Sequence, residues 1–337
     1  MENRLMQADA YLRQVTADRK IPGAVIAVGH REELLMLEAY GYAQWEPEEL
    51  PMTRDTVFDL ASLSKVTATW PCIAQLLDRQ VLTLDMKLAQ LLKRPVPAEM
   101  ENITLFHLLT HTAGLREDED LDSFGETRSE RIQGALTFPL GWPVGEGVHY
   151  SDLGFILLGE IVEIHSGMPL DQAAARIWSS LGMKSTCFCP SSDTYCAATE
   201  KVNGVVTRGI VHDERAQQLF GVAGHAGVFS TAADLARYCA ALLPGSGEKI
   251  CSDEWLRRSF ALHAPDARWD RGLAWVVHLE NAEGNFVGHT GFTGTTLWID
   301  TATGNYCVLL SNRVHPTREN PHMMEIRKEI RQILFEK

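Results

Sequence analysis

A serine and a lysine stand three residues apart at Ser62 and Lys65, in the segment ASLSKV. Residues 63–79 have the pattern of a helix, and side chains three apart on a helix share a face, so the lysine amine can reach the serine hydroxyl. Backbone N–H groups at the helix start favour negative charge developing near Ser62. The pattern indicates a serine nucleophile with a lysine partner. The same spacing occurs at Ser246 and Lys249 in a glycine-rich turn, so this motif alone fits an ordinary helix-start serine equally well.

Tyr150, in the segment HYSDLG, directly precedes a second predicted helix. A free phenol, with a pKa of about 10, is a poor base, but a nearby Lys65 ammonium would favour the phenolate and lower that pKa. The phenolate would take the Ser62 proton and later deliver it to the leaving group. Ser151 or Asp152 acting as a simple helix cap is the competing explanation, and both can hold together.

A third element, His289-Thr290-Gly291, lies in the strand-like segment VGHTGFTGTTLWID. Glycine on a strand lets the backbone come close to a substrate. The N–H of Phe292, together with that of Ser62, would form an oxyanion hole, and His289 and Thr290 would hold a substrate carboxylate. The alternative is a histidine at a sheet edge followed by a turn glycine.

Together these segments resemble the serine β-lactamase and penicillin-binding-protein superfamily, especially its class C-like branch. The resemblance implies a serine hydrolase in which Ser62 is acylated and Lys65 and Tyr150 form the acid/base pair. It also implies that His289-Thr290-Gly291 is the counterpart of the K-T-G strand. The matching segments, in the family's order, are FDLASLSKV, ITLFHLLTHTAGL, HYSDLGFILLGEIVE and GHTGFTGTTLWID.

Two residues depart from the family pattern and bear on the substrate. Asp152 stands where β-lactamases of this branch have asparagine, and an ionised carboxylate only accepts hydrogen bonds. Beside Lys65 this carboxylate would raise the lysine pKa and leave more of the proton transfer to Tyr150. His289 replaces lysine and is mostly neutral at pH 7, so the cleft offers less positive charge to a carboxylate. We therefore expect weak activity on penicillins. If His289 must be charged, substrate binding weakens as the pH rises through roughly 6 to 7.

The segment GIVHDE, followed by GVAGHAGVFS, is similar to uncharacterised hydrolases and muropeptide amidases of the superfamily. We consider His212, Asp213 and Glu214 possible substrate contacts on a loop near the cleft, although a solvated loop is the simpler explanation. His111 and His225 lie next to glycines in loop motifs, and we interpret both as structural.

Strand patterns near both chain ends enclose a largely helical middle. Unpaired strands near the N-terminus need partners, and strands near the C-terminus are the natural candidates. We therefore predict an α+β fold: one antiparallel β-sheet built from both chain ends and flanked by helices, with an inserted all-helical subdomain and the site at their junction. The predicted strands are 23–29, 34–42, 272–279, 295–300 and 306–311; the predicted sheet domain is 1–65 with 205–337, and the helical insert is 66–204.

Composition narrows the possible partners. The 337 residues carry a formal net charge of −13, which argues against a nucleic-acid partner. No apolar run is long enough for a membrane span, and the N-terminus lacks the basic and apolar regions of a signal peptide. Seven scattered cysteines fit reduced thiols, so we expect a cytoplasmic protein. The cluster of Cys187, Cys189 and Cys196 lacks a standard zinc spacing, and we expect no metal and no cofactor.

The leading hypothesis is an acyl hydrolase that works through an acyl-Ser62 intermediate. Its expected partner is a small-molecule or peptide substrate, and amide hydrolysis of a cell-wall peptide or muropeptide is the first choice. A carboxylesterase acting on short acyl esters is the near alternative. A penicillin-binding sensor without turnover belongs to a different class. The sequence leaves the oligomeric state open.

Overall fold

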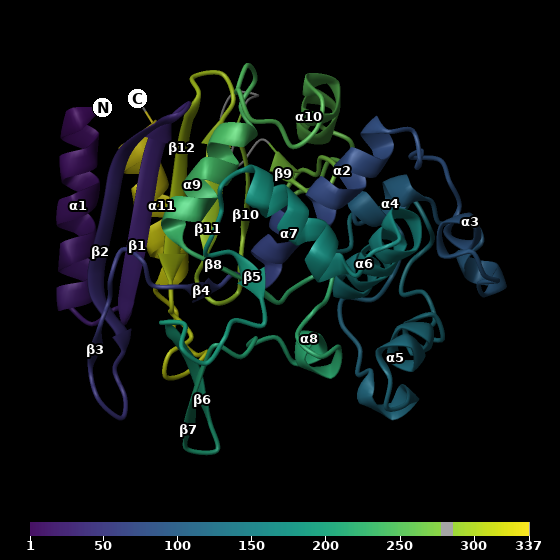
Figure 1. Ribbon diagram of the computed structural model, residues 1–337, viewed down its shortest axis with the longest axis horizontal. Helices are drawn as coiled ribbons and strands as arrows, with labels where there is room; N and C mark the ends of the chain where they lie inside the picture. Colours follow the sequence, from purple (N-terminus) through teal and green to yellow (C-terminus); the bar gives the residue numbers. More distant parts are fainter. Residues whose placement is uncertain (278–285, 337) are drawn as a thin grey trace.

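A single seven-stranded sheet joins the two ends of the chain in the computed structural model, which describes residues 1–277 and 286–336 (Figure 1). The strand order is β3-β2-β1-β12-β11-β10-β9, and all neighbouring strands are antiparallel. The prediction of one antiparallel sheet built from both chain ends is confirmed. The strands are β1(Gly23–His30), β2(Glu33–Gln44), β3(Leu50–Pro51), β9(Val276–Val277), β10(Phe286–Thr290), β11(Thr296–Asp300) and β12(Asn305–Ser311).

The C-terminal strands differ from the prediction at one point. The run predicted as a strand over 272–279 is a strand only at Val276–Val277, and residues 278 and 279 lie outside the described part of the chain. Residues 272–275 instead form bends, with Ala274 in the left-handed region at φ +73°.

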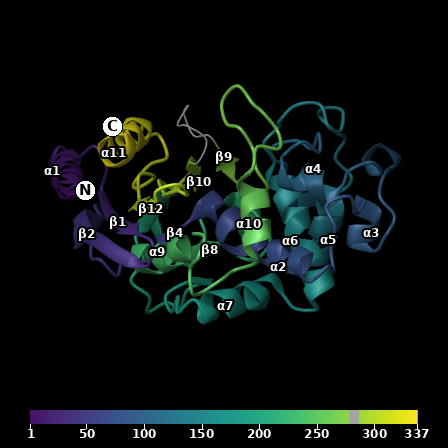
Figure 2. The same ribbon diagram turned by 90° about the horizontal axis from the view of Figure 1, so that it is seen from above.

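Both faces of the sheet are covered by helices. β1 (GAVIAVGH) is buried along almost its whole length, because successive side chains point to opposite covered faces. On one face Ile26 packs with apolar side chains of α1(Glu2–Ala17) and α11(Met323–Phe335). Figure 2 shows these two helices side by side at one end of the molecule, near both termini. α9(Ala232–Ala241) packs against β1 and β12 on the opposite face.

The helical region lies beside the sheet and is built around α6 (Figure 1). The last part of the predicted helical insert also contains short strands, and the boundaries 66–204 remain a prediction. The helices are α2(Trp70–Asp78), α3(Leu88–Leu92), α4(Leu105–Leu109), α5(Arg128–Ala135), α6(Asp152–Ser166) and α7(Leu170–Ser180); the strands are β5(Cys187–Phe188) and β6(Ala198–Val202).

Nine of the 15 residues of α6 are buried in the core. Across residues 1–277 and 286–336, no single helix is long and apolar enough to cross a membrane. α6 and α7 meet that criterion only jointly, as a pair bent by 78°. Apolar residues of this kind are typical of a core helix.

Candidate active site

Ser62 lies in a short 3-10 turn, η1(Ala61–Leu63), where the sequence predicted the start of a regular helix. A π-helical turn, η2(Lys65–Thr69), follows and leads into α2. Ala61 has φ +47°, a left-handed conformation that costs a non-glycine residue about 1–3 kcal/mol. Asp59 Oδ1 accepts the Ala61 N–H at 2.9 Å and holds this turn. The predicted helix is therefore interrupted where the nucleophile candidate is presented.

The two residues proposed for proton handling, Lys65 and Tyr150, meet at the hydroxyl oxygen of Ser62. Lys65 Nζ donates to Ser62 Oγ at 3.0 Å, and the Tyr150 hydroxyl donates to the same oxygen at 2.9 Å. Lys65 is fully buried, and its Nζ lies 4.9 Å from the centre of the Tyr150 ring. The structure therefore brings the three predicted residues together, with the Ser62 hydroxyl between one ammonium and one phenol.

Asp152 belongs to the same cluster and also begins α6. Its Oδ1 lies 2.6 Å from Lys65 Nζ. Ser151 Oγ accepts the Gly154 N–H at 3.2 Å, so the helix cap and the ion pair exist together. Burial is the largest single influence and lowers the pKa of Lys65, but Asp152 and Tyr150 together outweigh it, so the net direction is upward. The predicted effect of Asp152 on the lysine is confirmed in direction.

The predicted lowering of the Tyr150 pKa is wrong. Burial is the largest influence and raises the pKa of the phenol; Lys65 opposes it, and the Asp152 carboxylate adds to it, so the net direction is upward. The sequence could not show how completely the ring is enclosed. At neutral pH the resting pair is therefore a Lys65 ammonium and a neutral Tyr150 phenol.

The third motif packs onto the residues that precede Ser62. A Cβ added at Gly291 would lie 2.4 Å from the carbonyl oxygen of Leu60, so only glycine fits this approach. Thr293 Oγ1 donates to the Asp59 carbonyl at 2.7 Å, and Thr295 Oγ1 donates to the Leu60 carbonyl at 2.9 Å. The predicted close backbone approach exists, but its partner is the Ser62 turn. This backbone contact fixes the segment that contains Thr290 and the half-exposed Phe292 beside the nucleophile candidate.

His289 is buried and lacks a charged acceptor. Its Nδ1 lies 2.9 Å from the Thr290 carbonyl oxygen, and its Nε2 has no hydrogen-bond partner among the described residues. Burial, followed by the positive charges of Arg271 and Lys65, holds the His289 pKa well below its usual value. A neutral His289 removes the basis for the predicted weakening of substrate binding between pH 6 and 7.

Arg271 supplies positive charge that the sequence analysis missed. Its guanidinium carbon lies 5.5 Å from the centre of the Tyr150 ring, and the side chain is almost fully buried. Its Nε and Nη1 have no hydrogen-bond partner within residues 1–277 and 286–336. Burial lowers its pKa from the usual value, with Tyr150 opposing that effect. Nothing in the local segment WDRGLAW signals this position, because it depends on a tertiary contact.

The three predicted loop contacts have different surroundings. His212 donates its backbone N–H to Asp59 Oδ2 at 2.6 Å, and its ring lies 5.7 Å from that of Phe292, so it borders the site. Asp213 is partly buried and pairs with another histidine of the site. Glu214 forms an ion pair with Arg318 at 2.7 Å near the surface. The simpler explanation, a solvated loop, therefore fits Glu214 better than it fits His212 or Asp213.

Two further histidines support this region. His111 Nδ1 accepts the Ser151 N–H at 3.1 Å, and its ring stacks on Tyr150 with centroids 4.6 Å apart. These contacts agree with a structural role for His111. His225 is fully buried, and its carbonyl oxygen accepts from Lys65 Nζ at 3.2 Å. The structure thus places His225 in direct contact with the lysine of the site.

One group of side chains has the composition of a cation site. The ligand atoms of Asp152, Asp213 and His225 lie within 4.8 Å of one another. The Lys65 ammonium lies 2.6 Å from Asp152 and within hydrogen-bond distance of the His225 carbonyl. This ammonium already provides the positive charge that the two carboxylates require.

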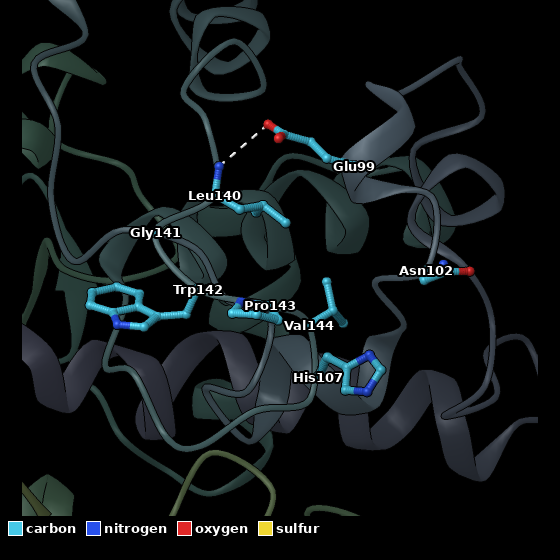
Figure 3. A pocket seen from close by; sticks show the side chains of 8 residues that line it. All are labelled: Glu99, Asn102, His107, Leu140, Gly141, Trp142, Pro143 and Val144. Carbon is cyan, nitrogen blue, oxygen red and sulfur yellow. Dashed lines mark hydrogen bonds between the residues drawn. The ribbon is translucent and has the colours of Figure 1, made fainter.

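A surface hollow of about 650 Å³ lies next to the segment that leads to Tyr150 (Figure 3). In it, the Leu140 N–H donates to Glu99 Oε1 at 3.3 Å. Trp142, from the same segment, stacks on His149 with ring centroids 3.9 Å apart. The hollow is lined by Glu99, Asn102, His107, Leu140, Gly141, Trp142, Pro143 and Val144.

The fold and the cluster around Ser62 define a serine hydrolase of the penicillin-recognising type. The family model described as Beta-lactamase matches residues 8–331, and the chain belongs to this family. The predicted resemblance is confirmed.

Two curated relatives and one solved structure extend this result. The chain is 30% identical to an N-acetylmuramyl-L-alanine amidase of Bacillus subtilis, over 90% of this chain and 81% of the relative. It is 28% identical to a putative D-alanyl-D-alanine carboxypeptidase of Escherichia coli, over 96% of this chain and 86% of the relative. A class C beta-lactamase from Rhodobacter sphaeroides shares the fold, with a TM-score of 0.73, 22% identity and coverage of 96% and 99% of the two chains.

Proposed function

We propose that this protein hydrolyses an amide bond in a cell-wall peptide or muropeptide through an acyl-Ser62 intermediate. The observation that carries the proposal is the convergence of the Lys65 ammonium and the Tyr150 phenol on Ser62 Oγ, at 3.0 and 2.9 Å. The names of the amidase and carboxypeptidase relatives support the substrate class.

In the proposed reaction, Ser62 Oγ attacks the substrate carbonyl while its proton passes to Tyr150 in the phenolate form. The resulting phenol then protonates the leaving amine, and the acyl group remains on Ser62. Water hydrolyses this ester in a second step, with Tyr150 again accepting and returning the proton. The backbone N–H groups of Ser62 and Phe292 are the proposed donors to the oxyanion.

The raised pKa values of Lys65 and Tyr150 set the pH dependence of this reaction. At neutral pH most molecules hold an ammonium and a phenol, and the phenolate form is a minor population. Because this population grows as the pH rises, we expect the rate of Ser62 acylation to increase with pH through the neutral range.

The polar groups around Ser62 favour substrates other than penicillins. The Asp152 carboxylate accepts but does not donate hydrogen bonds, so it suits a substrate amide N–H or amine better than a penicillin side-chain carbonyl. His289 is neutral, which leaves Arg271 as the second buried positive charge beside the Tyr150 ring, in addition to Lys65. We expect poor turnover of benzylpenicillin.

Mass spectrometry of the intact protein tests the proposal. The protein is mixed with a muramoyl-peptide, a short p-nitrophenyl ester or benzylpenicillin, with Ser62→Ala as the control. We expect an acyl adduct on Ser62 and release of the amine product from the muramoyl-peptide. Turnover of the ester alone would favour a carboxylesterase, and a stable penicillin adduct without release would favour a sensor. Equal adducts on the Ser62→Ala variant would overturn the assignment of the nucleophile.

A further inference from the structure

Two loop segments that the reaction does not use meet behind Lys65. Asp213, from GIVHDE, and His225, from GVAGHAG, form a pair with Oδ1 and Nε2 2.7 Å apart. An ionised carboxylate has no hydrogen to give, so His225 Nε2 carries the hydrogen of this bond. The imidazole is fully buried, and the carboxylate is mostly covered. Such a buried pair needs a structural or chemical reason to be present.

The loop that contains His225 is fixed tightly against α6 and η2. A Cβ added at Gly224 would lie 1.9 Å from the Phe155 carbonyl oxygen, so this glycine allows direct backbone contact with α6. The Gly224 carbonyl accepts from Thr69 Oγ1 at 2.6 Å. The next carbonyl, that of His225, accepts from Lys65 Nζ at 3.2 Å. The loop therefore presents a fixed acceptor to the lysine.

Asp213 anchors the other end of the pair. Its Oδ1 accepts the Ala216 N–H at 2.8 Å and caps the short helix α8(Glu214–Gln218). Burial favours the neutral form of Asp213. The interactions with His225 and the charge of Lys65 outweigh burial and hold the Asp213 pKa well below its usual value. Asp213 is therefore ionised across the neutral range.

The charged groups around Lys65 come from several elements. Asp152 faces it from α6, and Asp213 lies close enough to Asp152 for their carboxylate oxygens to be within 4.8 Å of each other. Tyr150 and the buried, neutral His289 face it from the site, with neutral His111 behind Tyr150. Arg271 lies on the Tyr150 ring. The Lys65 ammonium thus contacts the Asp152 carboxylate, the His225 carbonyl and Ser62, and it acts on the Asp213 carboxylate beside Asp152 through its charge.

We propose that Asp213 and His225 are positioning residues for the acylation of Ser62. The His225 carbonyl and the Asp213 carboxylate hold Lys65 as an ammonium directed at Ser62 Oγ, and the imidazole keeps the carboxylate in place. The inference rests on the proposed function, because it assigns a task to Lys65. It gives the GIVHDE and GVAGHAG segments one shared role.

Rates of Ser62 labelling by a fluorophosphonate, measured from pH 6 to 10, test this role. His225→Ala keeps the main-chain carbonyl but removes the imidazole that holds the Asp213 carboxylate and fills the space behind Lys65, and we expect labelling to slow by about 10- to 100-fold. His225→Gln keeps an N–H donor toward Asp213 and is expected to recover much of the rate. Asp213→Asn keeps the helix cap but removes one of the two carboxylates facing Lys65. We expect its pH–rate profile to move to lower pH by roughly one unit.

The matched control is Glu163→Gln, which breaks the partly exposed Arg128–Glu163 ion pair at 2.8 Å elsewhere on α6. It is expected to change stability but not the pH–rate profile. Wild-type labelling by a folded His225→Ala variant, or an unmoved profile for Asp213→Asn, overturns the inference. If His225→Ala does not fold, the Asp213→Asn profile decides alone. Absence of Ser62 labelling in the wild type overturns the proposed function, and this inference with it.

Discussion

Replacing Asp152 by asparagine tests the electrostatics of the site most directly. The substitution removes a carboxylate 2.6 Å from Lys65 Nζ while keeping the size of the side chain. This carboxylate raises the pKa of both Lys65 and Tyr150, because it stabilises the ammonium and opposes the phenolate. Both pKa values should therefore fall. An opposite or like charge at about 4–6 Å changes a pKa by about 1 to 3 pH units.

The assay is the rate of the first acylation step with p-nitrophenyl acetate between pH 6 and 10. For Asp152→Asn we expect the midpoint of the pH–rate profile to fall by about 1 to 3 pH units. The rate at pH 7 should rise, since more of the basic form is present. Asp152→Glu keeps the charge and serves as the control, with a profile near that of the wild type. A midpoint that stays in place or moves upward would refute the reasoning.

The same variant has a predicted cost in stability. A raised Lys65 pKa contributes stability that is fully present below the unfolded-state pKa of 10.5 and is lost as the pH rises through the folded-state value. Removing one partner of a buried ion pair costs about 3–5 kcal/mol, and Asp213 offsets part of this here. Urea unfolding should show a loss of roughly 1–4 kcal/mol for Asp152→Asn at pH 7. The loss should shrink at strongly alkaline pH.

Two further substitutions extend these tests. Gly291→Ala would bring a Cβ to 2.4 Å from the carbonyl oxygen of Leu60. We therefore expect a cost of about 1–3 kcal/mol in unfolding free energy, and we expect Ser62 labelling to slow at least about 10-fold. Labelling at the wild-type rate would contradict the close approach. Arg271→Met removes the cation on the Tyr150 ring, which raises the Tyr150 pKa and moves the pH–rate profile to higher pH, opposite to Asp152→Asn. Arg271→Lys should restore the profile, and a downward movement in Arg271→Met would show that the guanidinium does not act on the phenol.

Each short motif was ambiguous alone, and the order of the segments together with the family resemblance predicted the central cluster. Ser62 and Lys65 are close in sequence, and Tyr150 precedes a helix whose start is marked by a cap, so each position had a local signal. Pairing of strands from the two chain ends followed from the need to cover sheet edges. These features depend on short segments and on general rules of packing.

Features that depend on tertiary burial were not predictable in the same way. The raised Tyr150 pKa follows from complete enclosure of the ring, which no local pattern encodes. Arg271 reaches that ring from a turn with no periodic pattern. The left-handed Ala61 is held by a tertiary hydrogen-bonded turn at Asp59, whereas the pattern of residues 63–79 predicted a regular helix from this point on.

The pairing of β1 with β12 has a consequence for how the protein is made. Ala24 lies opposite Ser311, so the middle of the sheet forms only between segments at opposite ends of the polypeptide. Arg327 of α11 also donates to the Gly291 carbonyl at 2.8 Å, which ties the strand beside Ser62 to the final helix. During synthesis β1 therefore leaves the ribosome long before β12, and the edge of β1 that β12 will cover stays open to wrong pairing. The segment beside Ser62 can therefore be completed only after α11 has been synthesised.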